Sequence, residues 1–208
     1  MISSKVELEK TLEEVGTFNK PKLFFEQYRL PAPVAAEILW YAHLRHNDVE
    51  GKTIVDLGCG TGMLTLGAAL LGAEYVVGLD IDQNAISDAR KTAIRLGLGM
   101  RSDFVVGDVR FLGLRADVVI QNPPFGVRRR EADRAFIVAG LSIAPKVYSL
   151  HRGGESVRRF IFRFVGDVGG KVDEVLPLKI KLPPTYHFHR KRFYLFEADL
   201  YRIVRVKQ

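Results

Sequence analysis

Short apolar runs alternate along the chain with longer segments in which apolar positions recur every three or four residues. The short runs are typical of buried strands, and the longer segments are typical of helices that bury one face. This alternation predicts βαβ units and a mainly parallel sheet covered by helices. The predicted strands cover residues 53–57, 75–79, 104–106, 118–120 and 146–150. The predicted helices cover residues 33–47, 62–71, 83–96, 131–141 and 154–165.

The two ends of the chain depart from this alternation. Residues 6–15 have a helical period, and the proline-containing segment after them is typical of a lid-like connector. Near the C-terminus two extended runs, 171–180 and 192–206, follow one another, which predicts an antiparallel pair of strands at one edge of the sheet. We therefore expect a single domain, 1–208, made of an N-terminal helix and lid-like segment at 1–32, a core at 33–170 and the antiparallel strands at 171–208.

Composition places the chain among ordinary globular proteins. It has 208 residues, of which 47% are hydrophobic and 26% are charged, which is enough for one well-formed core. No apolar run approaches the roughly 18 residues that a membrane helix requires, so we expect no membrane span. The first residues lack the apolar centre of a secretory signal, and Cys59 is the single cysteine. These features predict a cytoplasmic protein.

Positive charge is concentrated toward the C-terminus. The formal net charge is +7; residues 151–208 hold 13 Lys and Arg against 6 Asp and Glu, whereas residues 1–150 hold 18 of each. Aromatic residues lie among these cations at 186–194. Cations follow phosphates and aromatic rings stack on unpaired bases, so nucleic acid is the predicted substrate class, with a solvated basic loop as the alternative. The predicted RNA contacts are Arg128, Arg129, Arg130, His187, His189, Arg190, Lys191 and Arg192.

A glycine-rich turn follows the first predicted strand. Gly58, Gly60 and Gly62 let the backbone turn sharply into the next helix and leave room for a ligand against the main chain. The dinucleotide fingerprint would require its third glycine at position 63, where this chain has Met63. The turn therefore predicts a nucleotide-like cofactor other than NAD.

Three aspartates stand at the ends of consecutive predicted strands. Asp80 is placed to accept both hydroxyls of a ribose, and Asp108 is placed to accept an adenine amino group. Asp56 would orient the glycine turn near the amino-acid part of a cofactor, and Ile81 would pack on its adenine. Each aspartate alone is better explained as a strand-end cap, but the three together fit S-adenosylmethionine.

The sequence Asn122-Pro123-Pro124-Phe125 directly follows the apolar run 118–120. An exocyclic aromatic amine is a weak nucleophile because its lone pair is delocalised, so it must be held by acceptors and aligned with a methyl donor. Asn122 and a backbone carbonyl offer those acceptors, the prolines stiffen the turn, and Phe125 offers a stacking face. A turn that only ends a strand is the alternative. Because the cofactor features lie upstream, we predict an amine methyltransferase with these four residues at its catalytic site.

No intrinsic metal site is predicted. His43 and His46 lie on one helical segment, and His187 and His189 alternate in the basic loop, but no cysteine or carboxylate cluster joins either pair. Cys59 lies inside the glycine turn, where we expect it to pack rather than to react.

These motifs together resemble class I S-adenosylmethionine methyltransferases. The chain is most similar to the archaeal and eukaryotic methyltransferase-like family that methylates N6 of adenine in small-subunit ribosomal RNA. The resemblance implies a Rossmann-like α/β fold with a mainly parallel seven-stranded sheet, an antiparallel C-terminal edge and helices on both faces. It also implies that Asn122 to Phe125 bind the target adenine. The motifs that carry it are residues 25–28, 56–60, 78–82, 122–126, 147–151 and 186–189.

The resemblance also implies a cofactor site and a partner. Where relatives often carry Pro-Thr, this chain has Arg29-Leu30, so a hydroxyl contact to the cofactor from that position is not expected. Eukaryotic members need a small zinc-binding activator subunit that pairs with a sheet edge, and such a subunit is a candidate partner here. The residues expected to contact S-adenosylmethionine are Gln27, Tyr28, Asp56, Gly58, Gly60, Thr61, Met63, Asp80, Ile81, Asp108, Val109 and Asn122.

Several rival functions stay open at this point. N2-guanine RNA methylation and protein glutamine methylation use related Asn-Pro-Pro turns, commonly with tyrosine where this chain has Phe125. DNA adenine methylation shares the chemistry, but the chain has no evident extra domain that reads a duplex. A ribosome-assembly factor that binds RNA and cofactor without turnover is the non-enzymatic rival, and Asn122 and Asp80 argue against it. We therefore predict an N6-adenine RNA methyltransferase.

Overall fold

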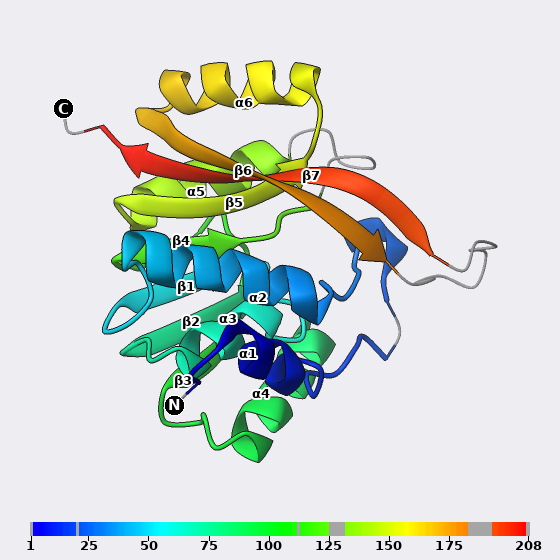
Figure 1. The fold of residues 1–208 in the computed structure, drawn as a ribbon. Helices are drawn as coiled ribbons and strands as arrows, with labels where there is room; N and C mark the ends of the chain where they lie inside the picture. The colour runs from blue at the N-terminus through cyan, green and yellow to red at the C-terminus, as the bar shows by residue number, and fades with distance from the viewer. Residues whose placement is uncertain (1, 20, 112, 125–131, 183–192, 207–208) are drawn as a thin grey trace.

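A mixed seven-stranded sheet forms the centre of the protein (Figure 1). The computed structural model describes residues 2–19, 21–111, 113–124, 132–182 and 193–206. The strand order is β3-β2-β1-β4-β5-β7-β6; β1 to β5 run parallel, and β7 is antiparallel to both β5 and β6. The predicted mainly parallel sheet with an antiparallel C-terminal edge is therefore confirmed. The strands are β1 Thr53–Leu57, β2 Tyr75–Asp80, β3 Ser102–Val106, β4 Val118–Gln121, β5 Lys146–Arg152, β6 Gly170–Leu182 and β7 Tyr194–Arg205.

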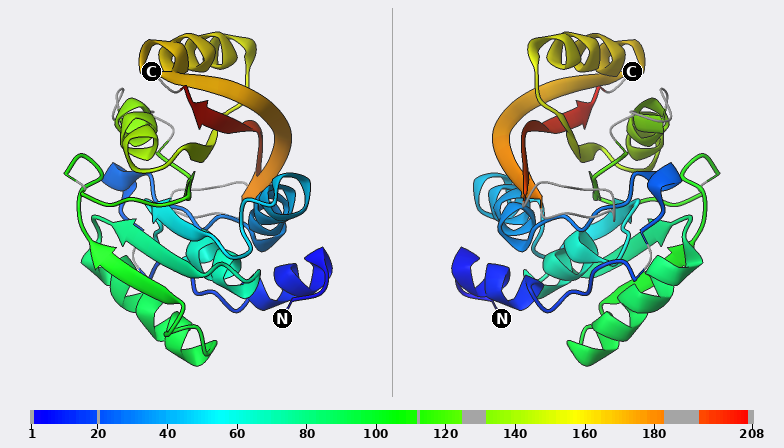
Figure 2. Two further views of the ribbon diagram at one scale, coloured as in Figure 1. Left: turned by 90° about the vertical axis from the view of Figure 1, so that its left-hand side faces the viewer. Right: turned by 90° about the vertical axis from the view of Figure 1, so that its right-hand side faces the viewer.

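Helices cover both faces of the sheet, as predicted. Buried side chains of the first four helices join one apolar cluster, and those of the last two join a second cluster across the sheet. Figure 2 shows α2 and α5 on opposite sides of the strands. In the described ranges no helix is both long and apolar enough to cross a lipid bilayer. The helices are α1 Lys5–Leu12, α2 Ala32–Trp40, α3 Met63–Leu70, α4 Gln83–Arg95, α5 Ala132–Ile143 and α6 Glu155–Asp167.

The first predicted core helix differs from the observed one. In place of one helix over 33–47, α2 ends at Trp40 and the chain continues as a wider π-helical turn over Tyr41–Arg45. Apolar periodicity does not distinguish these two forms of helix over a single turn. The turn delivers Asp48 to the amino end of the sheet, where its side chain is fully buried.

Asp48 holds this end of the sheet together through charged partners. Its carboxylate accepts hydrogen bonds from Lys146 at 2.5 Å, from the Tyr148 hydroxyl at 2.7 Å and from Arg202 at 2.9 Å. Burial alone would raise the pKa of Asp48, but these hydrogen bonds outweigh it, so the pKa lies below its ordinary value. The network connects the segment after α2 to β5 and β7.

Arg29 fixes the path of the connector, the segment between the end of α1 at Leu12 and the start of α2 at Ala32. Its Nε donates to the Val15 carbonyl at 3.0 Å, and its Nη2 donates to the Leu12 carbonyl at 3.1 Å and to the Glu13 carbonyl at 3.2 Å. These carbonyls belong to the end of α1 and the residues after it, where acceptors lack helical partners. Arg29, which stands where relatives often carry proline, thus attaches the connector to the end of α1.

Candidate active site

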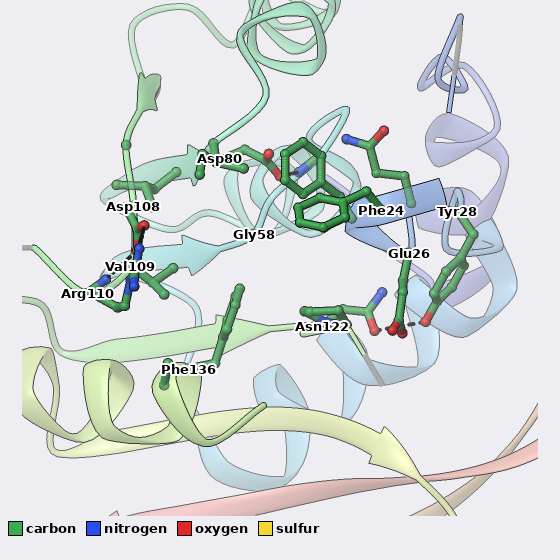
Figure 3. A pocket seen from close by; sticks show the side chains of 18 of the residues that line it. Phe24, Glu26, Tyr28, Gly58, Asp80, Asp108, Val109, Arg110, Asn122 and Phe136 are labelled. Atoms are coloured by element: carbon green, nitrogen blue, oxygen red, sulfur yellow. Dashed lines mark hydrogen bonds and ion pairs between the residues drawn. The ribbon is translucent and has the colours of Figure 1, made fainter. Parts of the chain in front are cut away.

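A cavity of about 580 Å³ opens at the carboxyl ends of the parallel strands (Figure 3). In open parallel sheets this edge is where ligands bind, because the loops there leave a crevice. The walls come from the glycine turn after β1, the loops after β2, β3 and β4, the start of α5 and the connector before α2. A smaller neighbouring cavity of about 40 Å³ is lined by Tyr28, Asp56, Thr61, Met63 and Asn122, among others. Twelve predicted cofactor residues therefore gather at one edge of the sheet.

The glycine turn requires its glycines. Gly58 has φ 71° and Gly60 has φ 54°, a left-handed region that other residues rarely adopt. A Cβ at Gly58 would lie 2.9 Å from the ring of Phe136, and a Cβ at Gly60 would lie 2.8 Å from the ring of Phe18. The turn thus forms a closely packed wall of the larger cavity, with its backbone toward the space.

Asp80 is the carboxylate at the end of β2. Its Oδ2 accepts from the Gly60 amide at 2.8 Å and its Oδ1 accepts from the Asp82 amide at 2.8 Å. Burial raises its pKa, although the backbone amides act in the opposite direction. Each carboxylate oxygen has two lone pairs, so both can accept a further hydrogen bond from a ligand in the cavity. Ile81 lines the cavity beside it.

Asp56 lies deeper, below the glycine turn. Its Oδ2 accepts from the Thr65 amide at 2.9 Å and from the Thr65 hydroxyl at 2.6 Å. Its Oδ1 is buried and has no hydrogen-bond partner within the described part of the chain. Burial raises the pKa of Asp56 to about 7. A buried acceptor of this kind suits a donor from a bound molecule.

Gln27 has a second role that the sequence did not reveal. It was predicted to contact the cofactor and it lines the cavity, but its amide also fastens the connector. Its Oε1 accepts from the Lys22 amide at 2.7 Å, and its Nε2 donates to Asp82 at 2.8 Å. The Lys22 ammonium reaches the same carboxylate at 2.7 Å. The turn 22–27 is thereby attached to Asp82, the N-cap residue of α4.

Asn122 and the connector meet at the other end of the cavity. The Tyr28 hydroxyl donates to Asn122 Oδ1 at 2.9 Å, and Pro124 lines the cavity beside them. Figure 3 draws Glu26 at the same end as Tyr28 and Asn122. Sequence spacing could not reveal this contact, because its partners are 94 residues apart.

Asp108 has a partner that the sequence did not indicate. Its carboxylate accepts from Arg110 at 3.0 Å through Nε and at 2.6 Å through Nη2. The hydrogen bond and the opposite charge raise the pKa of the guanidinium. Both residues and Val109 line the cavity, so an adenine amino group would meet a carboxylate already held by Arg110.

Other sequence predictions concern Cys59, metals and the flanking loops. Cys59 is buried, as expected of a packing residue, and burial raises its thiol pKa. In the ranges that the structure covers, no group of three His, Cys, Asp or Glu could hold a metal ion. Some predicted site residues lie outside the described residues: Phe125, Arg128, Arg129, Arg130, His187, His189, Arg190, Lys191 and Arg192.

Comparison with known proteins places this geometry in a family. A model of the ribosomal protein L11 methyltransferase (PrmA) family matches residues 39–122, which run from the end of α2 to Asn122. The rRNA N(6)-adenosine-methyltransferase METTL5 of Danio rerio is 36% identical, with 94% of this chain and 96% of the relative covered. The rRNA N(6)-adenosine-methyltransferase Mettl5 of Drosophila melanogaster is 34% identical, with 94% and 93% covered.

A solved structure agrees over the full length. A suggested RNA methyltransferase of Pyrococcus horikoshii is 39% identical and superposes with a TM-score of 0.91, with 100% of both chains covered. The METTL5 relative aligns with 94% of the chain, whereas the PrmA match covers only residues 39–122. The chain has the class I S-adenosylmethionine methyltransferase fold and belongs to the METTL5 family of rRNA N(6)-adenosine-methyltransferases.

Proposed function

We propose that this protein transfers a methyl group from S-adenosylmethionine to N6 of an adenine in ribosomal RNA, with the small-subunit RNA as its substrate. The observation that carries the proposal is a single cavity with the glycine turn and Asp80 along one wall and Asn122 at one end. The relatives from Danio rerio and Drosophila melanogaster, named for rRNA N(6)-adenosine methylation, support the choice of base and of RNA.

The chain's own residues fit the cofactor. Gly58 and Gly60 form a turn against the cavity whose backbone conformation and close packing disfavour a Cβ, and Asp80 offers lone pairs to ribose hydroxyls. Asp56 Oδ1, which has no hydrogen-bond partner among the described residues, would accept a hydrogen bond from the cofactor's ammonium group. S-adenosylmethionine, when bound, supplies an electrophilic methyl group on a sulfonium centre. The residues that would complete its site are Gln27, Thr61, Met63, Ile81, Asp108 and Val109.

The acceptor end provides alignment rather than strong base chemistry. Asn122 Oδ1 keeps a second lone pair beyond the one that Tyr28 occupies, and it can accept a hydrogen bond from the target amine. Pro123 and Pro124 fix the backbone of the turn, so a carbonyl of this turn would be held in place to accept from the same amine. Holding the amine between these acceptors directs its lone pair toward the methyl group. Phe125 would stack on the base.

RNA would approach over the basic segments. We assign phosphate contacts to Arg128, Arg129, Arg130 and to the loop 187–192, because the excess of cations lies in the last part of the sequence. A small zinc-binding activator subunit would pair with β3, the strand at one end of the sheet order. Val105 and Val106 of that strand are 40% and 48% exposed, which supports a partner there.

Transfer of labelled methyl to small-subunit rRNA that lacks this modification tests the proposal. Digestion to nucleosides should give N6-methyladenosine at one site. Label in N2-methylguanosine or in protein glutamine would overturn the base or the substrate class. If label appears only after an activator subunit is added, the partner assignment gains support.

Asn122→Ala separates catalysis from binding. We expect kcat to fall at least about 100-fold, as for the loss of one oriented catalytic hydrogen bond, while the affinity for S-adenosylmethionine stays within about twofold. Asn84→Ala, in an exposed part of α4, is the matched control and should keep full activity. An Asn122→Ala enzyme as fast as the wild type would contradict the assigned role.

A further inference from the structure

The contact between Tyr28 and Asn122 joins the connector to the catalytic turn. Tyr28 was predicted to contact the cofactor, yet its hydroxyl donates to Asn122 Oδ1 at 2.9 Å. In Figure 3 the ring of Tyr28 descends from the connector, and its hydroxyl meets the amide of Asn122, which extends sideways from the end of β4. The phenol therefore acts on a residue of the acceptor end.

Tyr28 is a permanent donor. Burial raises the pKa of its phenol, and the negative charge of Glu26 adds to the increase. The hydroxyl thus keeps its hydrogen throughout the neutral range, because a buried phenolate is poorly solvated. A protonated hydroxyl facing Asn122 favours the oxygen of that amide over its nitrogen.

The connector holds Tyr28 from a constrained backbone. Glu26, two residues earlier, has φ 52° and ψ 34°, a left-handed conformation that is rare for a residue other than glycine. Such a conformation persists where the surroundings fix it. Here the Glu26 amide donates to the Leu23 carbonyl, and Gln27 and Lys22 are both attached to Asp82. The hydroxyl of Tyr28 is therefore presented from a fixed position.

The orientation of Asn122 matters because its amide has two unlike ends. The oxygen accepts hydrogen bonds and the NH₂ group donates them, while the two ends have nearly the same shape. A half-turn about the last side-chain bond would place N–H groups against the N–H groups of the target amine. That arrangement repels the amine and cannot direct its lone pair. Packing alone does not choose between the two orientations.

We propose that Tyr28 is a positioning residue that locks the Asn122 amide with Oδ1 toward the target amine. One lone pair of Oδ1 takes the hydroxyl hydrogen, and the second accepts from the amine. This role rests on the proposed function, since it assumes that Asn122 holds an exocyclic amine. It assigns Tyr28 to the acceptor end and leaves cofactor contact to the glycine turn and Asp80.

Tyr28→Phe tests the proposal, because it removes only the hydroxyl. We expect kcat on small-subunit rRNA to fall about tenfold, the effect of losing one orienting hydrogen bond. The affinity for S-adenosylmethionine, the KM for RNA and the melting temperature should change little. In ¹⁵N-labelled protein without cofactor, the Asn122 side-chain NH₂ signals should shift or broaden. Tyr75→Phe, on an exposed tyrosine of β2, is the control and should change none of these quantities.

The same substitution in an Asn122→Asp protein tests whether the effect comes from the orientation of the Asn122 amide. Aspartate has two equivalent oxygens, so in Asn122→Asp either orientation offers an acceptor, and adding Tyr28→Phe should reduce the remaining activity less than about twofold. Unchanged kcat and unchanged Asn122 signals in Tyr28→Phe would overturn the proposal. So would weaker S-adenosylmethionine binding with normal kcat at saturation, which would place Tyr28 at the cofactor. Failure of the proposed function is distinct, since the wild type itself would then form no N6-methyladenosine.

Discussion

At the scale of single residues, two buried aspartates show how local partners determine a charge. Asp48 and Asp56 are both almost completely buried. Asp48 has three donors from cationic and phenolic side chains, and its pKa is lowered. Asp56 has only the amide and hydroxyl of Thr65, and burial raises its pKa to about 7. Asp48 therefore stabilises the fold as a carboxylate, whereas the negative charge of Asp56 is poorly compensated inside the site.

The raised pKa of Asp56 predicts a pH dependence of stability. A carboxyl group whose folded-state pKa is above its unfolded-state value binds more protons when folded, so the free energy of unfolding falls as pH rises from about 4 to about 7. The full shift corresponds to roughly 4 kcal/mol. Asp56→Asn removes this titration, and urea denaturation of the cofactor-free protein between pH 4 and 8 should show a smaller decline. Part of the decline should remain in this variant, because the pKa of Asp80 is also raised.

Asp48→Asn is the control of opposite sign. The lowered pKa of Asp48 contributes stability above its unfolded-state pKa, and this contribution is lost as pH falls. Its asparagine variant should therefore be less stable at pH 7, where Lys146 and Arg202 lose a charged partner. An Asp56→Asn protein with the same decline as the wild type would show that Asp56 does not titrate in this range.

At the scale of elements, strands were easier to predict than connections. β1 was predicted over its full length, because a strand buried on both faces is rich in apolar residues, here Ile54, Val55 and Leu57. The antiparallel pair β6 and β7 followed from two long extended runs. The π-helical turn after α2 and the fastening of 22–27 to Asp82 were not predictable. Both depend on hydrogen bonds between distant residues, which leave no period in the sequence.

The basic loop gives a prediction at the same scale. Replacing Arg190, Lys191 and Arg192 by glutamine should weaken rRNA binding and lower the slope of log K against log salt by about 2, since each lost phosphate contact on a single strand contributes about 0.7. Affinity for S-adenosylmethionine should stay unchanged. The matched control replaces three exposed cations elsewhere: Lys10, Lys91 and Arg101. Equal losses in both variants would indicate only a general effect of charge.

At the scale of the whole molecule, the order of motifs in the sequence predicted that their residues would converge on one cavity. The glycine turn, Asp80, Asp108 and Asn122 follow successive parallel strands, and such strands end at a common edge. Their convergence therefore required only the fold class. The connector between α1 and α2 forms a further wall. Only the family resemblance placed Gln27 and Tyr28 there, because composition and spacing do not show where a connector will lie.

The connector between α1 and α2 links two properties that are chemically separate, cofactor binding and base recognition. The turn 22–28 contributes Phe25 and Gln27 to the cavity that would hold the cofactor, and Tyr28 to the amide that would hold the base. A redesign that changes the accepted base by altering this turn will also alter cofactor affinity, and selection for tighter cofactor binding will act on base recognition. The two halves of the enzyme cannot be exchanged as modules, because one short segment belongs to both.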